Sequence, residues 1–223
     1  MTDLTFYTNP MSRGRIVRWM LEELGEPYET VVLDYGTTMK GADYLAINPM
    51  GKVPAIRHGD TVVTEAAAIC AYLADAFPEK GLAPPPGHRS RGPYYRWLFF
   101  AAGPVEQAVT GKALGLLAPE DKKAMAGYGS FDETIDALAS AIVPGPYICG
   151  EQFTAADVYV GAQIGWGMMF GTIEKRPAFE AYFGRLQARP AAIRANQLDD
   201  AAMPKAETDC GDEECPMTES EPQ

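Results

Sequence analysis

The stretch from Asn48 to Leu73 constrains the fold most, because it carries a proline inside a run of strand-forming residues. Residues 53–57 and 61–64 are two β-prone runs, and the Gly-containing turn between them predicts a hairpin. Pro54 has no N–H to donate, which confines it to the first residue or the edge of a strand. The backbone N–H and C=O of Val53 are therefore expected to face outward, available to an extended peptide.

A helix is expected to begin at Thr64, with Glu65 in its first turn and apolar residues at Ile69, Tyr72 and Leu73. The first N–H groups of a helix have no partner within the helix and suit a carboxylate. A backbone edge beside such a helix start predicts a site for something small and peptide-like.

The chain before this stretch predicts a strand at 4–7, a helix at 12–25 and a strand at 28–33. The helix has one apolar stripe, so Glu22 and Glu23 are expected to face solvent. Strand, short helix and strand form a βαβ unit, in which the two strands are parallel. With the hairpin and its helix, this order indicates an α/β thioredoxin-like domain.

Beyond residue 93 strand signals vanish and helical periodicity dominates. Helices are expected at 94–117 (kinked at Gly103-Pro104), 119–142, 154–172 and 177–189, with a short one after Pro190. The predicted organisation is a thioredoxin-like domain at 1–76, a Pro-rich linker at 77–93, an all-α domain at 94–198 and an acidic, disordered tail at 199–223.

The net charge of −11 is concentrated at one end of the chain. Residues 199–223 carry a net charge of −8 and the remainder only −3. The sequence has no stripe of basic residues of the kind that indicates nucleic-acid binding. No apolar run approaches 18 residues and no leader pattern opens the chain, so a cytoplasmic protein without a membrane segment is expected.

Four cysteines and two histidines give no zinc pattern, so no metal site is predicted. Cys210 and Cys215 lie in the acidic tail. A soft-metal site or a disulfide between them is the less favoured interpretation, because acidic low-complexity ends are commonly inert.

The string ICGEQFTAADVY at 148–159 predicts a helix start. Thr154 is expected to be the N-cap and Asp157 to complete a capping box, with Phe153 and Val158 as a hydrophobic staple. This role is structural.

That string, with NPMGKVPAI at 48–56 and TEAAAICAYLADAFP at 64–78, resembles the cytosolic (bacterial) glutathione S-transferases over roughly residues 4–195. The resemblance implies a thioredoxin-like N-terminal domain followed by an all-α C-terminal domain. It also implies an enzyme, usually a homodimer, that uses glutathione as co-substrate and conjugates it to a small apolar electrophile.

Carried over by position, the resemblance places glutathione on five residues. Val53 would pair with the cysteine backbone of glutathione, ahead of a cis Pro54. Glu65 and the N–H of Ala66 would hold the γ-glutamyl end, and Lys52 would reach the glycine carboxylate. The family usually has Ser or Thr where this chain has Ala66, and the missing hydroxyl contact corresponds to about 1 kcal/mol of binding.

The first turn has no Cys-x-x-Cys, which excludes a dithiol mechanism there. Ser12 offers a hydroxyl at the start of a helix, where the dipole favours a negative charge. The resemblance makes it the first choice as donor to the glutathione thiolate, because serine-type members of the family carry the catalytic serine two residues after a proline in this turn. Tyr7 is the alternative, because other classes of the family use a tyrosine at the end of this strand. Features of the beta class are present without its cysteine and histidine, whose candidate positions hold Ser12 or Arg13, and Glu106.

Two other functions remain open from the sequence. Ala66 and the acidic tail are compatible with a non-catalytic ligand-binding or protein-interaction module. An isomerase, peroxidase or dehalogenase would use the same thiolate as a conjugating enzyme, so the residues alone do not separate these activities.

Overall fold

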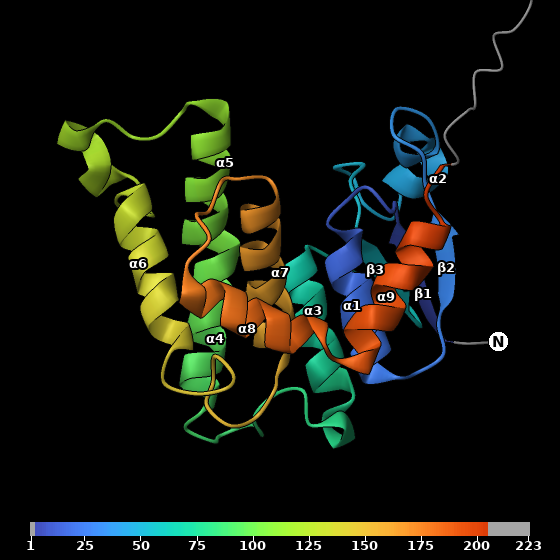
Figure 1. The fold of residues 1–223 in the computed structure, drawn as a ribbon. Helices are drawn as coiled ribbons and strands as arrows, with labels where there is room; N and C mark the ends of the chain where they lie inside the picture. Colours follow the sequence, from blue (N-terminus) through green and yellow to red (C-terminus); the bar gives the residue numbers. More distant parts are fainter. Residues whose placement is uncertain (1–2, 205–223) are drawn as a thin grey trace, which may run out of the picture.

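The computed structural model describes residues 3–204 and shows a sheet-containing part followed by a helical part (Figure 1). The first part contains four strands: β1 (Leu4–Thr8), β2 (Glu29–Val32), β3 (Ala55–His58) and β4 (Thr61–Thr64). Its helices are α1 (Gly14–Leu24), the 3-10 turn η1 (Thr38–Lys40), α2 (Ala42–Leu45), α3 (Ala66–Ala76) and the 3-10 turn η2 (Pro78–Lys80).

The strands form one sheet in the order β2-β1-β3-β4. β1 and β2 are parallel, whereas β1 with β3 and β3 with β4 are antiparallel. The predicted βαβ unit and hairpin are therefore confirmed. Gly25 follows α1 with φ 71° and caps its C-terminus by donating its N–H to the carbonyl of Leu21.

The second part is helical throughout the described residues. Its elements are α4 (Arg91–Phe100), the π-helical turn η3 (Ala101–Val105), α5 (Glu106–Leu114), the 3-10 helix η4 (Glu120–Met125), α6 (Phe131–Ile142), α7 (Ala155–Met169), α8 (Pro177–Gln187) and α9 (Pro190–Ala201). The π-helical turn contains Pro104, where the kink was predicted. A proline inside a helix lacks the N–H that the regular pattern requires, and the wider turn accommodates that loss.

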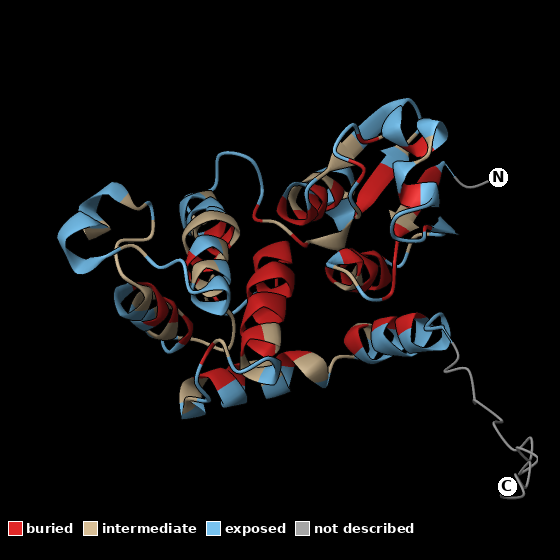
Figure 2. Cartoon of the chain, turned by 90° about the horizontal axis from the view of Figure 1, so that it is seen from above, coloured by how far each residue is buried: buried red, intermediate tan, exposed pale blue. Residues whose placement is uncertain are grey.

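Helix α7 is the centre of the helical part and is buried along almost its whole length (Figure 2). Thr154 and Asp157 form the predicted capping box, with 2.8 Å from the Thr154 N–H to Oδ2 of Asp157. The other oxygen of Asp157 accepts from the Ile148 N–H and the Tyr182 hydroxyl, each at 2.8 Å. One carboxylate thus ties the helix start to the preceding loop and to α8.

The start of α4 and the end of α9 differ from the boundaries predicted from the sequence. Helix α4 begins at Arg91, inside the predicted linker, because Pro93 lies in the first turn, where backbone N–H groups have no helical partner anyway. Helix α9 continues to Ala201, three residues past the expected end of the helical part, with Asp199 buried. The rest of the predicted tail, including Cys210 and Cys215, lies outside the described residues.

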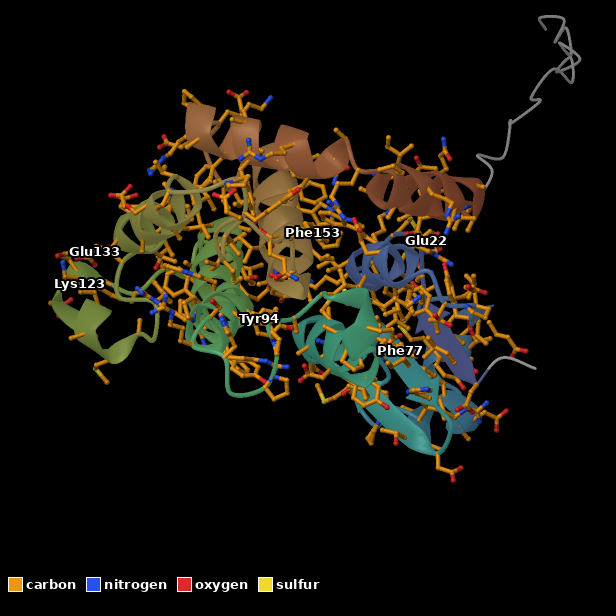
Figure 3. All side chains as sticks on the ribbon, turned by 90° about the horizontal axis from the view of Figure 1, so that it is seen from below. Glu22, Phe77, Tyr94, Lys123, Glu133 and Phe153 are labelled. Carbon is orange, nitrogen blue, oxygen red and sulfur yellow. The ribbon has the colours of Figure 1, made fainter. Side chains whose placement is uncertain are left out.

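The expectation that Glu22 and Glu23 face solvent is wrong. Their side chains are only 4% and 5% exposed, because α9 and the residue before it cover this side of α1. Arg194 binds Glu22, and Arg189 binds both carboxylate oxygens of Glu23 at 2.6 and 2.7 Å. In Figure 3 Glu22 lies between α1 and α9.

Candidate active site

The sheet register brings three separate parts of the chain to one edge. Tyr7 of β1 is paired with Ala55 of β3, and Ala55 is paired with Thr64 of β4. The turn that follows β1, the residues that precede β3 and the residue that follows β4 therefore lie side by side. These segments contain Ser12, Lys52-Val53-Pro54 and Glu65-Ala66, which are the residues that the sequence singled out.

The turn after β1 is tightly organised by Asn9. Its side-chain amide donates to the carbonyl of Leu33 at 2.8 Å, and its side-chain oxygen accepts from the Met11 N–H at 2.9 Å. The Ser12 hydroxyl donates to the Asn9 carbonyl at 2.7 Å and accepts from the Gly14 N–H at 2.9 Å. Ser12 is therefore half-buried at the start of α1, with its oxygen engaged within the turn.

The segment before β3 is held by its neighbours through the Lys52 carbonyl. The Tyr44 hydroxyl and the Asn48 side-chain amide both donate to this oxygen at 2.7 Å. The Lys52 side chain is exposed and the Val53–Pro54 peptide bond is cis. Neither the N–H nor the C=O of Val53 has a hydrogen-bond partner in the part of the chain that the structure describes.

Glu65 directly precedes α3 instead of lying in its first turn. It has φ 68°, and no other non-glycine residue with positive φ occurs among residues 3–204. This backbone region costs a side-chain-bearing residue about 1–3 kcal/mol and is concentrated at functional sites. Its carboxylate is exposed and makes no cap to the helix, so the first N–H groups of α3, beginning with that of the buried Ala66, remain unpaired.

Tyr7, the alternative donor, is half-buried within β1, and its ring packs against Tyr44 with centroids 5.7 Å apart. Burial raises the pKa of Tyr44 to about 12, so this second phenol is neutral at physiological pH. The position of Tyr7 matches a packing role at the base of the site.

One feature of the site was missed from the sequence. Arg13 makes an ion pair with Glu106 at the start of α5, 93 residues away, and so connects the two parts of the molecule beside Ser12. The other carboxylate oxygen of Glu106 accepts from the Gln163 side chain of α7 at 2.9 Å. Spacing carried no signal for this pair, because its partners come from different parts of the fold.

Within the described chain, a hollow lies away from this site, whereas candidate metal clusters and membrane-spanning helices are absent. A hollow of about 520 Å³ lies at the other end of α1, lined by residues such as Leu21, Tyr28 and Leu198, none of which belongs to the site above. No group of three or more His, Cys, Asp or Glu within the described residues is placed to hold a metal ion. Within the same residues no helix has the length and hydropathy that crossing a bilayer requires.

The comparisons with known proteins agree over both parts of the chain. The family model for the glutathione S-transferase N-terminal domain matches residues 11–76, and the one for the C-terminal domain matches residues 107–185. Glutathione S-transferase GstA of Escherichia coli O157:H7 is 30% identical over 174 residues, covering 76% of this chain and 86% of the relative. The chain belongs to the glutathione S-transferase family.

Solved structures of the glutathione S-transferase family share the fold. A glutathione transferase from Methylococcus capsulatus has a TM-score of 0.75 at 32% identity, covering 89% of this chain and 99% of that one. A sphingomonad glutathione S-transferase, complexed with glutathione, has a TM-score of 0.71 at 30% identity, covering 88% and 98%. The thioredoxin-like N-terminal part and the all-α C-terminal part are thus those of the family, and membership makes the chain a transferase.

Proposed function

We propose that this transferase binds glutathione at the sheet edge described above, stabilises its thiolate and conjugates the sulfur to a small apolar electrophile. The observation that carries the proposal is the register Tyr7–Ala55–Thr64, which assembles a backbone edge, a helix start and a hydroxyl at one place. The sphingomonad relative complexed with glutathione supports the choice of ligand.

The peptide part of glutathione fits the unused groups of this edge. The N–H and C=O of Val53 are paired by nothing else in the described residues, so they suit the cysteine backbone of an extended tripeptide. The start of α3 offers unpaired N–H groups and a positive dipole end to the γ-glutamyl carboxylate. Glu65 provides the opposite charge for the γ-glutamyl amine, and Lys52 for the glycine carboxylate.

The sulfur would then lie at the start of α1, where we assign Ser12 as the hydroxyl donor and Tyr7 as the alternative. A free thiol with a pKa near 8.5 is only about 3% ionised at pH 7. Lowering that pKa by roughly two units increases the thiolate about 25-fold, and one charge-assisted hydrogen bond is enough to do so. Met11, next to Ser12 and 57% exposed, offers apolar surface to the electrophile.

Assembly and location form part of the same proposal. Tyr95 and Phe99 lie on one side of α4 with ring centroids 6.2 Å apart, and Phe99 is 66% exposed. Burying such aromatic surface against a second copy removes it from water, which supports a homodimer. We place the enzyme in the cytoplasm, where glutathione keeps thiols reduced and where the detoxification of electrophiles would take place.

The test combines binding and turnover. Glutathione binding is measured by calorimetry, and activity is measured with a chlorodinitrobenzene-type substrate for wild type, Ser12→Ala and Tyr7→Phe. Ser12→Ala should lose at least tenfold in turnover with little change in glutathione affinity, whereas Tyr7→Phe should retain activity. Ser140→Ala is the matched control, because within residues 3–204 this hydroxyl on α6 bonds only to the Asp136 carbonyl.

Two outcomes separate the parts of the proposal. Unchanged turnover in Ser12→Ala would remove Ser12 from its role while leaving the activity in place. A wild-type protein that binds no glutathione would contradict the proposed function itself. Ala66→Ser, which restores the hydroxyl usual in the family, should tighten glutathione binding by about fivefold, corresponding to about 1 kcal/mol.

A further inference from the structure

Arg13 lies between Ser12 and the first residue of α1, and its guanidinium crosses from the sheet-containing part to the helical part. Its Nη2 donates to Oε1 of Glu106 at the start of α5. The Arg13 side chain is 49% exposed and that of Glu106 is 27% exposed. An ion pair this open contributes little to stability, so its position beside the proposed sulfur site calls for a functional account.

Glu106 is held from the opposite side by buried groups of α7. The Gln163 amide donates to Oε2 of Glu106 at 2.9 Å and to the Tyr159 hydroxyl at 3.2 Å. Gln163 and Tyr159 are each only 5% exposed, and burial raises the pKa of Tyr159 to about 12, which keeps its hydroxyl neutral. The carboxylate that binds Arg13 is therefore fixed in orientation by the core of the helical part.

The Ser12 hydroxyl is less available than its position suggests. A hydroxyl has one proton, and here it is donated to the Asn9 carbonyl at 2.7 Å. Ser12 must release that bond before it donates to a sulfur. A guanidinium has five N–H groups, and among the described residues the Arg13 guanidinium donates a hydrogen bond only to Glu106. Arg13 can thus donate to a second anion without losing its first partner.

We propose that Arg13 donates to the glutathione sulfur and stabilises its thiolate, and that Glu106 and Gln163 are positioning residues that hold the guanidinium there. The inference rests on the proposed function, because it requires glutathione at this edge. The other charged groups around the turn are Arg15, which is paired with Asp200, and Lys52 and Glu65 on the sheet side. Of the two arginines, Arg13 is the one whose remaining donors are uncommitted.

The test measures the thiol pKa of bound glutathione from the ultraviolet absorbance of its thiolate as a function of pH. Arg13→Gln should raise this pKa by about one to two units, because a charge-assisted hydrogen bond is lost. Arg13→Lys retains the positive charge, so the thiol pKa should rise less than in Arg13→Gln. Arg96→Gln, at an exposed arginine of α4 that stacks on Trp97, is the matched control and should leave the thiol pKa unchanged.

Variants of Glu106 test whether this residue positions Arg13 or has only a structural role. Glu106→Ala releases Arg13, so the thiol pKa should rise towards that of Arg13→Gln, with the glutathione KM changing less than kcat. Glu106→Gln retains an oxygen acceptor for Arg13 and removes a negative charge, so the thiol pKa should stay low or fall further. Thermal unfolding of each variant shows whether it is folded before its pH profile is measured.

The outcomes distinguish this inference from the proposed function. If wild type binds glutathione with a lowered thiol pKa and Arg13→Gln shows the same value, the role of Arg13 is overturned while the proposed function stands. If wild type does not bind glutathione, the proposed function itself fails. A raised thiol pKa in both Arg13→Gln and Glu106→Ala, with Arg96→Gln unchanged, supports the inference.

Discussion

Arg18 of α1 and Asp199 of α9 form an ion pair of 3.1 Å between side chains that are only 6% and 2% exposed. The two residues are 181 positions apart. The guanidinium also binds Thr30 at 2.9 Å and lies over the ring of Phe6. The end of the helical part is thus attached to the helix that begins at the candidate active site.

This pair is one of several along the same interface. Arg15 pairs with Asp200 at 2.7 Å, and Glu22 and Glu23 pair with Arg194 and Arg189. Only the pair between Arg18 and Asp199 is buried on both sides. Because removing water from an unpaired charge is expensive, we expect the loss of one partner to cost more here than at the other pairs.

The first prediction concerns this buried pair. Arg18→Met leaves the Asp199 carboxylate buried and unpaired, so the free energy of unfolding should fall by about 3–5 kcal/mol. The double variant Arg18→Met with Asp199→Leu removes both charges and should recover most of that loss. Denaturant unfolding measures both effects.

The control for the buried pair is Asp200→Asn, which weakens the pair with Arg15 at a side chain that is 67% exposed. Its effect on the free energy of unfolding should stay below about 1 kcal/mol. If Arg18→Met destabilises the protein no more than Asp200→Asn does, burial does not set the cost of losing the Arg18–Asp199 pair.

The second prediction concerns the start of α7. Thr154→Ala removes one capping acceptor and should lower the free energy of unfolding by about 1 kcal/mol. Asp157→Ala leaves the N–H groups of Ile148 and Thr154 and the Tyr182 hydroxyl without their acceptor, and should lower it by more than about 3 kcal/mol. Equal effects of the two variants in urea unfolding would argue against this network.

The third prediction concerns Gly14, the first residue of α1. A Cβ here would lie 2.0 Å from Oγ1 of Thr8 and 2.9 Å from Oγ of Ser12. Gly14→Ala should therefore displace the turn and lower the free energy of unfolding by about 1–3 kcal/mol. It should also reduce turnover with glutathione, as Ser12→Ala does, because the displaced turn carries Ser12.

The control for Gly14 is Gly184 in the middle of α8, where an added Cβ meets nothing within 4 Å. Gly184→Ala should raise the free energy of unfolding by about 0.5–1 kcal/mol, because alanine favours the helix. Thermal unfolding and the activity assay together check both variants. A Gly14→Ala protein as stable and active as wild type would show that the turn is not tightly constrained.

The fourth prediction concerns the cysteines. Burial raises the pKa of the Cys149 thiol to about 11 and that of the fully buried Cys70 thiol further still. A raised thiol pKa lowers the thiolate fraction at every pH below it, by about a factor of 100 for a shift of two units. Native Cys149 and Cys70 should therefore resist iodoacetamide at neutral pH.

Peptide mapping by mass spectrometry measures the alkylation of these two cysteines separately from that of Cys210 and Cys215. The alkylation rate of the unfolded protein is the reference. The alkylation of Cys149 should rise as the pH is raised towards 11. Rapid labelling of either cysteine in the folded protein at neutral pH would contradict the predicted protection and would reopen a cysteine-dependent mechanism.

The N-terminal half of the fold could be predicted because its signals are local. The hairpin follows from the turn between two β-prone runs, and the parallel pairing of β1 and β2 follows from the helix that connects them. The capping box at Thr154 and Asp157 also lies within four residues. In each case neighbours along the chain carry the whole interaction.

The errors about charged residues arise where distant residues meet. The apolar stripe of α1 predicts that Glu22 and Glu23 face solvent, because nothing in α1 itself shows that α9 covers them. The missed pair of Arg13 and Glu106 has the same cause, because its partners are 93 residues apart. A periodic pattern reports which side of a helix is apolar, and it does not report which charged side chains a later helix will neutralise.

By itself, the sequence determined the order of the elements around the site and which residues would lie at the sheet edge around Pro54, because turns, caps and hydrophobic periodicity act over a few residues. Only the tertiary structure decided which charges are buried together and which carboxylate pairs with the guanidinium of Arg13, the residue next to Ser12. The physical reason is that desolvation and ion pairing depend on distance in space, and the packing of α5, α7 and α9 sets those distances.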